Sequence, residues 1–283
     1  MKLLILYAIF CGLFFISTAK ELIDEDENSL VIGTFNIQWL GDGFDDKVDR
    51  TNKDFMNLAF LIENTGAEIF ALQEVENWKA IESLISFLPG WSYIFLNNST
   101  LQNQVFIYKN YIKVPEQKLF SELEVEKGRT RKGSLIKINY GNEDIFILNI
   151  HLKSTSRYDN TPEKKEKSFQ LRNKQARTIN KLAKEINKLK SNLIVLGDFN
   201  DNPTRKKSQI KSLENNLYFP TKKLKSCKAF YFDCIDHIAI NKYLKDNLEP
   251  YSQIMIDTKV FFKKNELEKI SDHCPVLIKL NFN

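Results

Sequence analysis

The chain has 283 residues, of which 43% are hydrophobic and 12% aromatic, which is enough material for a substantial core. Charged residues make up 27%, an ordinary fraction for a folded protein, and this excludes global disorder. The formal net charge of +5 permits a polyanionic partner but does not demand one.

Residues 1–19 have the composition of a secretory signal peptide. Lys2 precedes an apolar run at 3–16, and small residues (Ser-Thr-Ala) follow at 17–19. The run is too short to span a bilayer comfortably. We therefore predict a cleaved signal and a secreted or periplasmic protein, with an uncleaved anchor as the alternative. Residues 20–283 are predicted to form one domain.

Hydrophobic periodicity predicts an α/β protein in which strands and helices alternate early and strands dominate later. Three helices are expected, at 53–64, 78–88 and 169–189. Strands are expected at 31–40, 69–72, 91–96, 105–108, 111–120, 135–138, 145–152, 193–196, 234–240, 254–256 and 275–280. This succession favours sheets packed face to face, with helices outside.

Three cysteines remain beyond the signal: Cys227, Cys234 and Cys274. Export to an oxidising compartment favours disulfides. Cys227 and Cys234 flank a short stretch, so we expect them to pair with each other, with two unpaired thiols as the alternative. Cys274 is expected to be a buried, small apolar side chain.

Polar motifs follow several predicted strands. All three histidines lie in such motifs, at 149–153, 236–238 and 271–275, and Gly197-Asp198-Phe199-Asn200 closes another apolar run. Strand ends can present side chains into a common cleft, and histidine is suited to proton transfer near neutral pH. The candidates are Asn36, Glu74, His151, Asp198, Asn200, Asp236, His237, Asp272 and His273.

The oxygen-rich candidate set indicates a divalent metal. Burying several carboxylates without a cation is costly, because each charge loses hydration. Carboxylate and amide oxygens favour a hard ion over zinc, so we predict Mg²⁺, with Mn²⁺ or Ca²⁺ as alternatives. The sequence thus predicts a metal-assisted hydrolytic site.

Six of these motifs occur in the order typical of the endonuclease/exonuclease/phosphatase superfamily. They are Phe35-Asn36-Ile37-Gln38-Trp39, Leu72-Gln73-Glu74-Val75, Asn149-Ile150-His151-Leu152-Lys153, Gly197-Asp198-Phe199-Asn200, Ile235-Asp236-His237-Ile238 and Ser271-Asp272-His273-Cys274-Pro275. The chain resembles a secreted bacterial member of the deoxyribonuclease I-like branch over about residues 31–280. The resemblance implies a four-layer α/β sandwich, in which helices flank two packed mixed β-sheets.

The resemblance also implies roles for the metal-site residues. Glu74 would be the principal metal ligand, with Asn36 and Asp272 beside it. Asp198 and Asn200 would position or activate the attacking water and hold the phosphate. A phosphodiester transition state needs positive charge on its oxygens and a placed water, which such a set supplies.

Two histidines receive catalytic roles from the same resemblance. His273 would act as acid/base or phosphate ligand, oriented by Asp236, whose carboxylate would raise its pKa. His151 would be the second histidine near the scissile phosphate. Relatives pair it with a glutamate from a central strand, whereas residues 102–104 offer only amides here, so we expect His151 to lack a charged partner.

The remaining matches concern substrate binding. Arg131 resembles the family's phosphate-contacting arginine, and Lys153 belongs to a variant common among extracellular relatives. His237 is expected to line the wall of the cleft. The basic stretch 164–190 is expected to be a solvated helix face, with phosphate tracking as the alternative.

The sequence therefore predicts a monomeric, secreted, Mg²⁺-dependent phosphodiesterase that cuts nucleic acid, as a DNA endonuclease. One alternative is a sphingomyelinase-like enzyme acting on phospholipid, which needs exposed aromatic hairpins; no clear cluster of that type stands out in the sequence. Another is a non-catalytic binder or toxin subunit on the same fold, which the complete set of candidate residues disfavours.

Overall fold

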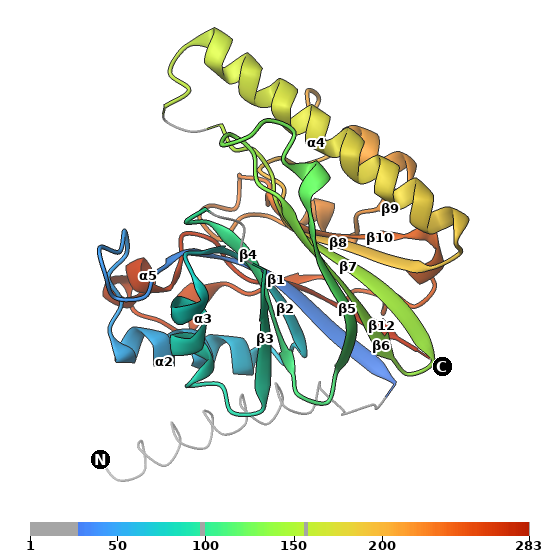
Figure 1. The fold of residues 1–283 in the computed structure, drawn as a ribbon. Coiled ribbons are helices and arrows are strands. Elements are labelled where there is room, and N and C mark those ends of the chain that lie inside the picture. The colour runs from blue at the N-terminus through green and yellow to red at the C-terminus, as the bar shows by residue number, and fades with distance from the viewer. Residues whose placement is uncertain (1–27, 97–99, 156–157, 283) are drawn as a thin grey trace.

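The structure is a computed structural model, and it describes residues 28–96, 100–155 and 158–282 (Figure 1). The predicted signal peptide lies outside the described residues. Across the described ranges, no helix has both the length and the apolar character needed to cross a membrane.

Two six-stranded sheets form the centre of the molecule. The first sheet contains, in spatial order, β11 (Ile254–Met255), β12 (Val276–Asn281), β1 (Ser29–Leu40), β2 (Ile69–Val75), β4 (Asn103–Lys109) and β3 (Trp91–Phe95). The second contains β5 (Lys113–Phe120), β6 (Gly133–Tyr140), β7 (Glu143–His151), β8 (Asn192–Asp198), β10 (Asp236–Asn241) and β9 (Leu217–Tyr218). Each sheet is mixed, because β1–β2 and β7–β8 are parallel pairs among antiparallel neighbours.

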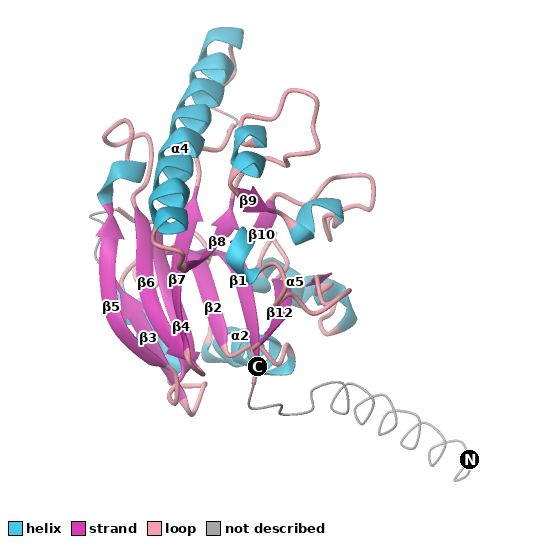
Figure 2. Ribbon diagram, turned by 90° about the vertical axis from the view of Figure 1, so that its right-hand side faces the viewer, coloured by secondary structure: helices cyan, strands magenta, loops and turns pink. Residues whose placement is uncertain are grey.

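Helices cover the outer faces of both sheets (Figures 1 and 2). Helices α2 (Asn52–Asn64), α3 (Trp78–Ile85) and α5 (Lys264–Ile270) share an apolar cluster with the first sheet. Helix α4 (Pro162–Lys188) packs on the second sheet. The predicted four-layer α/β sandwich is confirmed.

The three apolar layers between these elements follow from strand geometry. Successive side chains of a strand point to opposite faces. In β1, Leu30 and Ile32 face the layer between the sheets, whereas Phe35 and Ile37 face the helices of the first sheet. Because both faces are covered, the strand reads as a nearly continuous apolar run.

Two helix boundaries differ from the prediction by three residues or more, and the short helix α5 was not predicted. Helix α4 begins at Pro162, seven residues before the predicted start. The Thr161 side chain accepts from the Lys164 amide, and a proline suits the first helical turn. The first two turns are rich in lysine and carry no apolar period, so periodicity missed them. Helix α3 ends at Ile85 rather than at residue 88.

The predicted disulfide between Cys227 and Cys234 is wrong. Cys227 pairs with Cys274, 47 positions further along the chain, so Cys274 is not the free apolar side chain that we expected. Cys234 is free and buried in the layer between the sheets, and its Sγ lies 3.1 Å from the main-chain oxygen of Asp236. The prediction paired the two cysteines that are nearest in the sequence, whereas in the fold the turn at Cys274 packs against the loop that contains Cys227.

Candidate active site

Three neighbouring strands of the second sheet end in candidate side chains at the same level. His151, the last residue of β7, lies in register with Asp198, the last residue of β8. Asp198 in turn lies opposite Asp236, the first residue of β10. Side chains that share a register position project from the same face of a sheet, so these three groups meet at one edge.

The first sheet contributes Asn36 and Glu74 to the same place. The Nδ2 group of Asn36 donates to Glu74 Oε1 at 3.2 Å and to Asp198 Oδ2 at 3.1 Å. This buried amide therefore joins the carboxylates of two sheets. Glu74 has a φ of 64°, and the pairing register of β2 shifts between Leu72 and Val75. Such a bulge re-aims a side chain at the cost of backbone strain, which is typical of functional sites.

A buried amide pair beneath the site links the two sheets. Gln73 Nε2 donates to Asn149 Oδ1 at 2.8 Å, and Asn149 Nδ2 donates to two main-chain oxygens at 2.9 and 3.0 Å. Gln73 precedes Glu74, and Asn149 stands two residues before His151. The pair fixes one sheet against the other next to the site. Our sequence reasoning gave these amides no role, although polar side chains within apolar strands were the available signal.

His151 is buried against two carboxylates. Its Nε2 atom lies 3.4 Å from Asp198 Oδ2 and 3.9 Å from Glu74 Oε1. The expectation that it lacks a charged partner is therefore wrong, although residues 102–104 indeed supply none: Gln102 accepts from Arg131 instead. Burial and the positive charge of Arg131 lower the pKa of His151 well below its usual value, so the ring is neutral near pH 7.

His273 and Asp236 form a close pair. His273 Nδ1 lies 2.7 Å from Asp236 Oδ2. Burial disfavours the charged imidazole, but the neighbouring carboxylates, Asp236 first and then Asp198 and Asp272, together more than offset this and raise the pKa of His273 to about 10. The two histidines of the site thus have opposite protonation states at neutral pH, an arrangement suited to separate acid and base roles.

The Gly197-Asp198-Phe199-Asn200 motif is a tight turn at the end of β8. Gly197 has a φ of 141°, and a Cβ atom there would lie 2.0 Å from a main-chain oxygen of β7, so only glycine fits. Asp198 Oδ1 accepts from the Asn200 amide at 2.8 Å. Burial and the nearby charge of Asp236 raise the pKa of Asp198 to about 7.

The buried acidic groups fit a hard divalent cation. An oxygen of Asp198, an oxygen of Asp236 and a ring nitrogen of His273 lie within 4.8 Å of one another, and of these groups the two carboxylates can serve as donors while His273 is protonated. Asp236 Oδ1 is buried and finds no hydrogen-bond partner among the described residues. Glu74 shares the Asn36 amide with Asp198. Their carboxylate oxygens are the donors that Mg²⁺ prefers.

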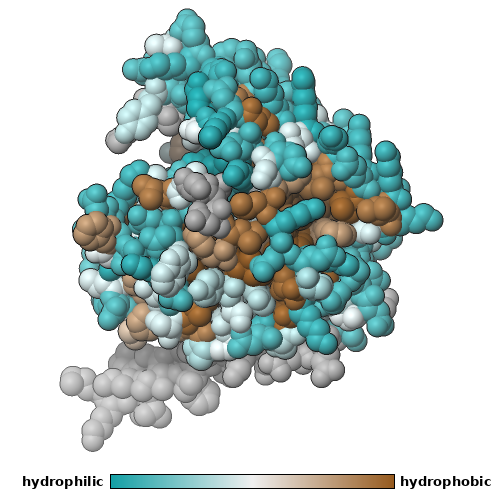
Figure 3. Space-filling view, viewed as in Figure 1, coloured by the Kyte–Doolittle hydropathy of each residue, from teal (hydrophilic) through white to brown (hydrophobic). Residues whose placement is uncertain are grey.

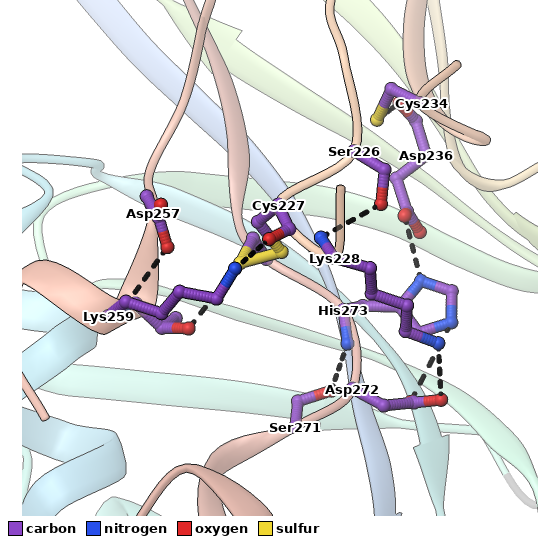
Figure 4. Close-up of a disulfide and its surroundings, with 12 residues drawn as sticks. Ser226, Cys227, Lys228, Cys234, Asp236, Asp257, Lys259, Ser271, Asp272 and His273 are labelled. Carbon is purple, nitrogen blue, oxygen red and sulfur yellow. Dashed lines mark hydrogen bonds and ion pairs between the residues drawn. A yellow bond between two sulfur atoms is a disulfide. The ribbon is translucent and has the colours of Figure 1, made fainter. Parts of the chain in front are cut away.

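Asp272, which we predicted to be a metal ligand, lies at the rim of the site instead of among these buried groups. Its side chain is 47% exposed and pairs with Lys228 at 2.8 Å, and its Oδ1 atom lies 3.8 Å from His273 Nε2 (Figure 4). The sequence reasoning also missed Lys228, because it treated that residue only as part of the loop between two cysteines.

Arg131 and Lys153 provide positive charge near the carboxylates. Burial lowers the pKa of Arg131, and the charges of Glu74 and Asp198 oppose that effect, which places the guanidinium within electrostatic reach of both. Burial also lowers the pKa of Lys153, while Asp159, whose carboxylate lies 4.0 Å from Lys153 Nζ, raises it.

We expected His237 to line the wall of the cleft, and this prediction is wrong. Its side chain is 0% exposed and packs between the rings of Phe199 and Phe219, with centroids 5.7 and 5.8 Å away. Its Nδ1 atom lies 3.2 Å from Thr221 Oγ1. Burial lowers the pKa of His237 to about 4, so it is a neutral core residue. Successive side chains of a strand point to opposite faces of the sheet, so Asp236 faces the site while His237 faces the core.

Comparisons with known proteins agree with this geometry. A model of the Endonuclease/Exonuclease/phosphatase family matches residues 14–263. No curated protein matches the chain. Among solved structures, a humanized TDP2 of D. rerio is 16% identical with a TM-score of 0.65, and the match covers 90% of this chain and 99% of that one.

Two further solved structures have the same fold. Truncated TDP2 of Caenorhabditis elegans is 15% identical with a TM-score of 0.66, over 89% of this chain and 98% of that one. The mannosyl-6-phosphatase Bt3783 of Bacteroides thetaiotaomicron is 15% identical with a TM-score of 0.64, over 89% of this chain and 100% of that one. The family match over residues 14–263 shows the family, whereas these distant likenesses show the fold alone. The chain belongs to the endonuclease/exonuclease/phosphatase family of metal-dependent hydrolases, which act on phosphoester bonds.

Proposed function

We propose that this protein is a secreted, monomeric, Mg²⁺-dependent phosphodiesterase that hydrolyses nucleic acid, with DNA as its main substrate. The observation that carries the proposal is that Asp198 contacts both the expected metal ligands and the proton-transfer pair. Asn36 links Asp198 to Glu74, and Asp236 and His273 lie close to the same carboxylate. A metal-assisted hydrolase needs such a continuous set of ligand oxygens and proton-transfer groups.

Glu74 and Asn36 would hold the metal, with Asp272 approaching from the rim. The bound ion would supply positive charge to the phosphate oxygens. Asp198, fixed by the amide of Asn200, would orient the attacking water. Support for these roles comes from the hydrogen bonds that join Asn36 to Glu74 and to Asp198, and from the ion pair of Asp272 with Lys228 at the rim.

The histidines divide the remaining work by their charge. His273 is protonated at neutral pH, so its Nε2 proton can neutralise a phosphate oxygen or pass to the leaving oxygen. His151 is neutral and can hydrogen-bond the phosphate without adding charge. Arg131 and Lys153 would bind the outer phosphate oxygens.

Nucleic acid is the substrate favoured by the surface. In Figure 3 the upper part of the molecule, where α4 lies, is hydrophilic, and the exposed residues of this helix include many lysines. Such a face can attract a polyanion, although it is also typical of a solvated helix. Secretion is supported by the disulfide, since disulfides persist in oxidising compartments.

A phospholipid phosphodiesterase is the second candidate. Three consecutive exposed aromatic residues, Phe230, Tyr231 and Phe232, lie near the site, and they form the kind of cluster that the sequence reasoning did not recognise. Aromatic side chains can enter a membrane interface. A non-catalytic binder is disfavoured, because the structure brings together the side chains that hydrolysis needs.

The test is incubation of the purified mature chain with plasmid DNA, RNA and sphingomyelin vesicles, each with Mg²⁺ and with a chelator. We expect plasmid nicking that requires the metal, and a loss of several orders of magnitude in His273→Ala. The matched control is His237→Gln, a histidine substitution away from the cleft, assayed only if it folds. If the protein hydrolysed only lipid, the substrate would be phospholipid and not nucleic acid. If it hydrolysed none of the three, the non-catalytic binding protein would be favoured.

A further inference from the structure

Residues 225–233, here called the aromatic loop, form a closed hairpin-like turn next to the site. Lys225 and Asp233 pair as an antiparallel bridge, and their side chains form an ion pair at 2.8 Å. The amide of Ser226 donates to the main-chain oxygen of Phe232 at 2.9 Å. The two ends of the loop are therefore hydrogen-bonded to each other, and the residues between them form its tip.

The tip presents three aromatic rings to solvent. Phe230, Tyr231 and Phe232 are 83%, 67% and 53% exposed. The ring centroids of Tyr231 lie 5.5 Å from those of Phe230 and 4.6 Å from those of Phe232, so the rings contact one another. Single exposed aromatics need no explanation, but a contiguous group marks an interaction surface.

Two links hold the aromatic loop against the turn that carries His273. The Cys227–Cys274 disulfide joins it to the residue after His273. The neighbouring Lys228 reaches across to Asp272, as Figure 4 shows. The loop is thus fixed in position relative to the proposed catalytic histidine.

A pocket of about 200 Å³ lies between the aromatic loop and the catalytic residues. Its lining includes Asp236 and His273 as well as Lys228, Phe232 and Arg205. Pockets that enclose a whole small molecule measure roughly 300–1,000 Å³. This one therefore suits a single group of a longer substrate that continues over the rim.

We propose that the aromatic loop is a stacking subsite for an unpaired nucleobase of single-stranded nucleic acid, adjacent to the scissile phosphate. The inference rests on the proposed nucleic-acid activity and adds a preference for unpaired stretches of that substrate. Aromatic rings beside cationic groups are the usual means of binding single strands, because every base has a π-face and every linkage a phosphate. A paired base inside a duplex cannot offer its face to such a platform.

The placement of the rings favours a base over a membrane. Phe232 lines the same pocket as His273, so a group stacked there lies next to the reacting phosphate. Charged groups surround the base of the loop: Asp233 pairs with Lys225 and also lies 3.7 Å from Arg205. A segment that enters lipid would have to bring these charges to the apolar boundary, which is costly.

The experiment compares binding of labelled oligonucleotides in the presence of a chelator, so that hydrolysis plays no part. The variant is Tyr231→Leu with Phe232→Leu, which keeps apolar side chains but removes the π-faces. The control is Tyr111→Leu, a tyrosine of similar exposure (65%) in the turn after β4. The strand register places that turn at the opposite end of the first sheet from Glu74.

We expect the double leucine variant to bind a single-stranded oligonucleotide at least about fivefold more weakly, the lower end of what base stacking contributes. Binding of a duplex should stay unchanged, and so should binding of a strand made abasic throughout. Tyr111→Leu should bind all three like the wild type. Equal single-strand affinity in the wild type and the double variant would overturn the subsite.

Vesicles of phosphatidylcholine and phosphatidylglycerol provide the second arm. Co-sedimentation of the wild type that persists in the leucine variant, without any preference for single strands, would assign the loop to lipid and overturn the proposal. The subsite and the proposed hydrolysis can be refuted separately. Metal-dependent nicking, with single-strand binding unchanged in the double variant, would refute only the subsite. Weaker single-strand binding in the double variant, without nicking by the wild type, would refute only the proposed hydrolysis.

Discussion

Removal of the Cys227–Cys274 disulfide should destabilise the fold by an amount that identifies the pairing. The perturbation is replacement of both cysteines by alanine. The cross-link spans 47 positions, and the chain-entropy model assigns a loop of that size about 4 kcal/mol of stabilisation. A cross-link between Cys227 and Cys234 would close a far smaller loop, worth about 2 kcal/mol by the same model.

The assay is urea unfolding of the oxidised wild type and the double variant, with linear extrapolation of the unfolding free energy. A loss of about 4 kcal/mol corresponds to a melting temperature lower by about 8–16 °C for a domain of this size. Reductant should bring the wild type down to the level of the variant. Cys234→Ala is the matched control, since it removes a buried thiol but keeps the cross-link, and it should still respond to reductant.

The reasoning would be refuted if peptide mapping of the oxidised protein linked Cys227 to Cys234. It would also fail if the double variant unfolded with the same free energy as the wild type. A hydrolysis assay adds a functional readout, because the disulfide holds Lys228 beside His273. We expect the double variant to lose activity at temperatures where it remains folded.

Four further predictions concern the site and the residues that support it. Nuclear magnetic resonance of the metal-free protein should find His237 titrating below, and His273 above, the range of about pH 5 to 8 in which histidine ordinarily titrates, with the pKa of His151 lowered from its ordinary value. Asp236→Asn should bring the pKa of His273 down into that range; an unchanged midpoint would contradict the pairing. Because the neighbouring carboxylates, Asp236 first, raise this pKa to about 10, His273 stabilises the fold fully below its ordinary value of 6.5, and the wild type should lose that stability as pH rises through about 10. Asn149→Leu should cost about 1–3 kcal/mol in urea unfolding, since it leaves buried polar partners without a hydrogen bond, and a neutral result would argue against the inter-sheet amide pair. Gly197→Ala should cost about 3 kcal/mol from overlap and strain, whereas Gly90→Ala, with open space and a φ of 83°, should cost only about 1 kcal/mol; equal costs in thermal unfolding would refute the close approach.

Local sequence patterns were sufficient to locate those elements whose signal lies within one short segment. The apolar run of β1 and the helical period of α2 located both elements to within two residues. The order of the polar motifs indicated the family and most of the residues that meet at the site. These features depend on neighbours along the chain, which sequence displays directly.

The histidines show where local reasoning stops. His237 stands beside Asp236 in a motif that resembles a functional one, yet the pleat of β10 turns it into the core. His151 acquires carboxylate partners from β2 and β8 rather than from the expected strand. Sequence alone shows that an imidazole is present, but not which face it occupies or what lies across from it.

Strand period and motif order can be recognised along the chain, so they were enough to predict the layered fold, the family and a set of chemically suited residues. The folded structure was needed to show that Cys274 pairs with Cys227, that Asp272 lies at the rim with Lys228, and that an aromatic loop borders His273. Each of these joins segments about forty residues or more apart, or depends on which of several loops crosses the site. Such contacts are set by how two sheets pack and where their connecting loops return, which no local pattern encodes.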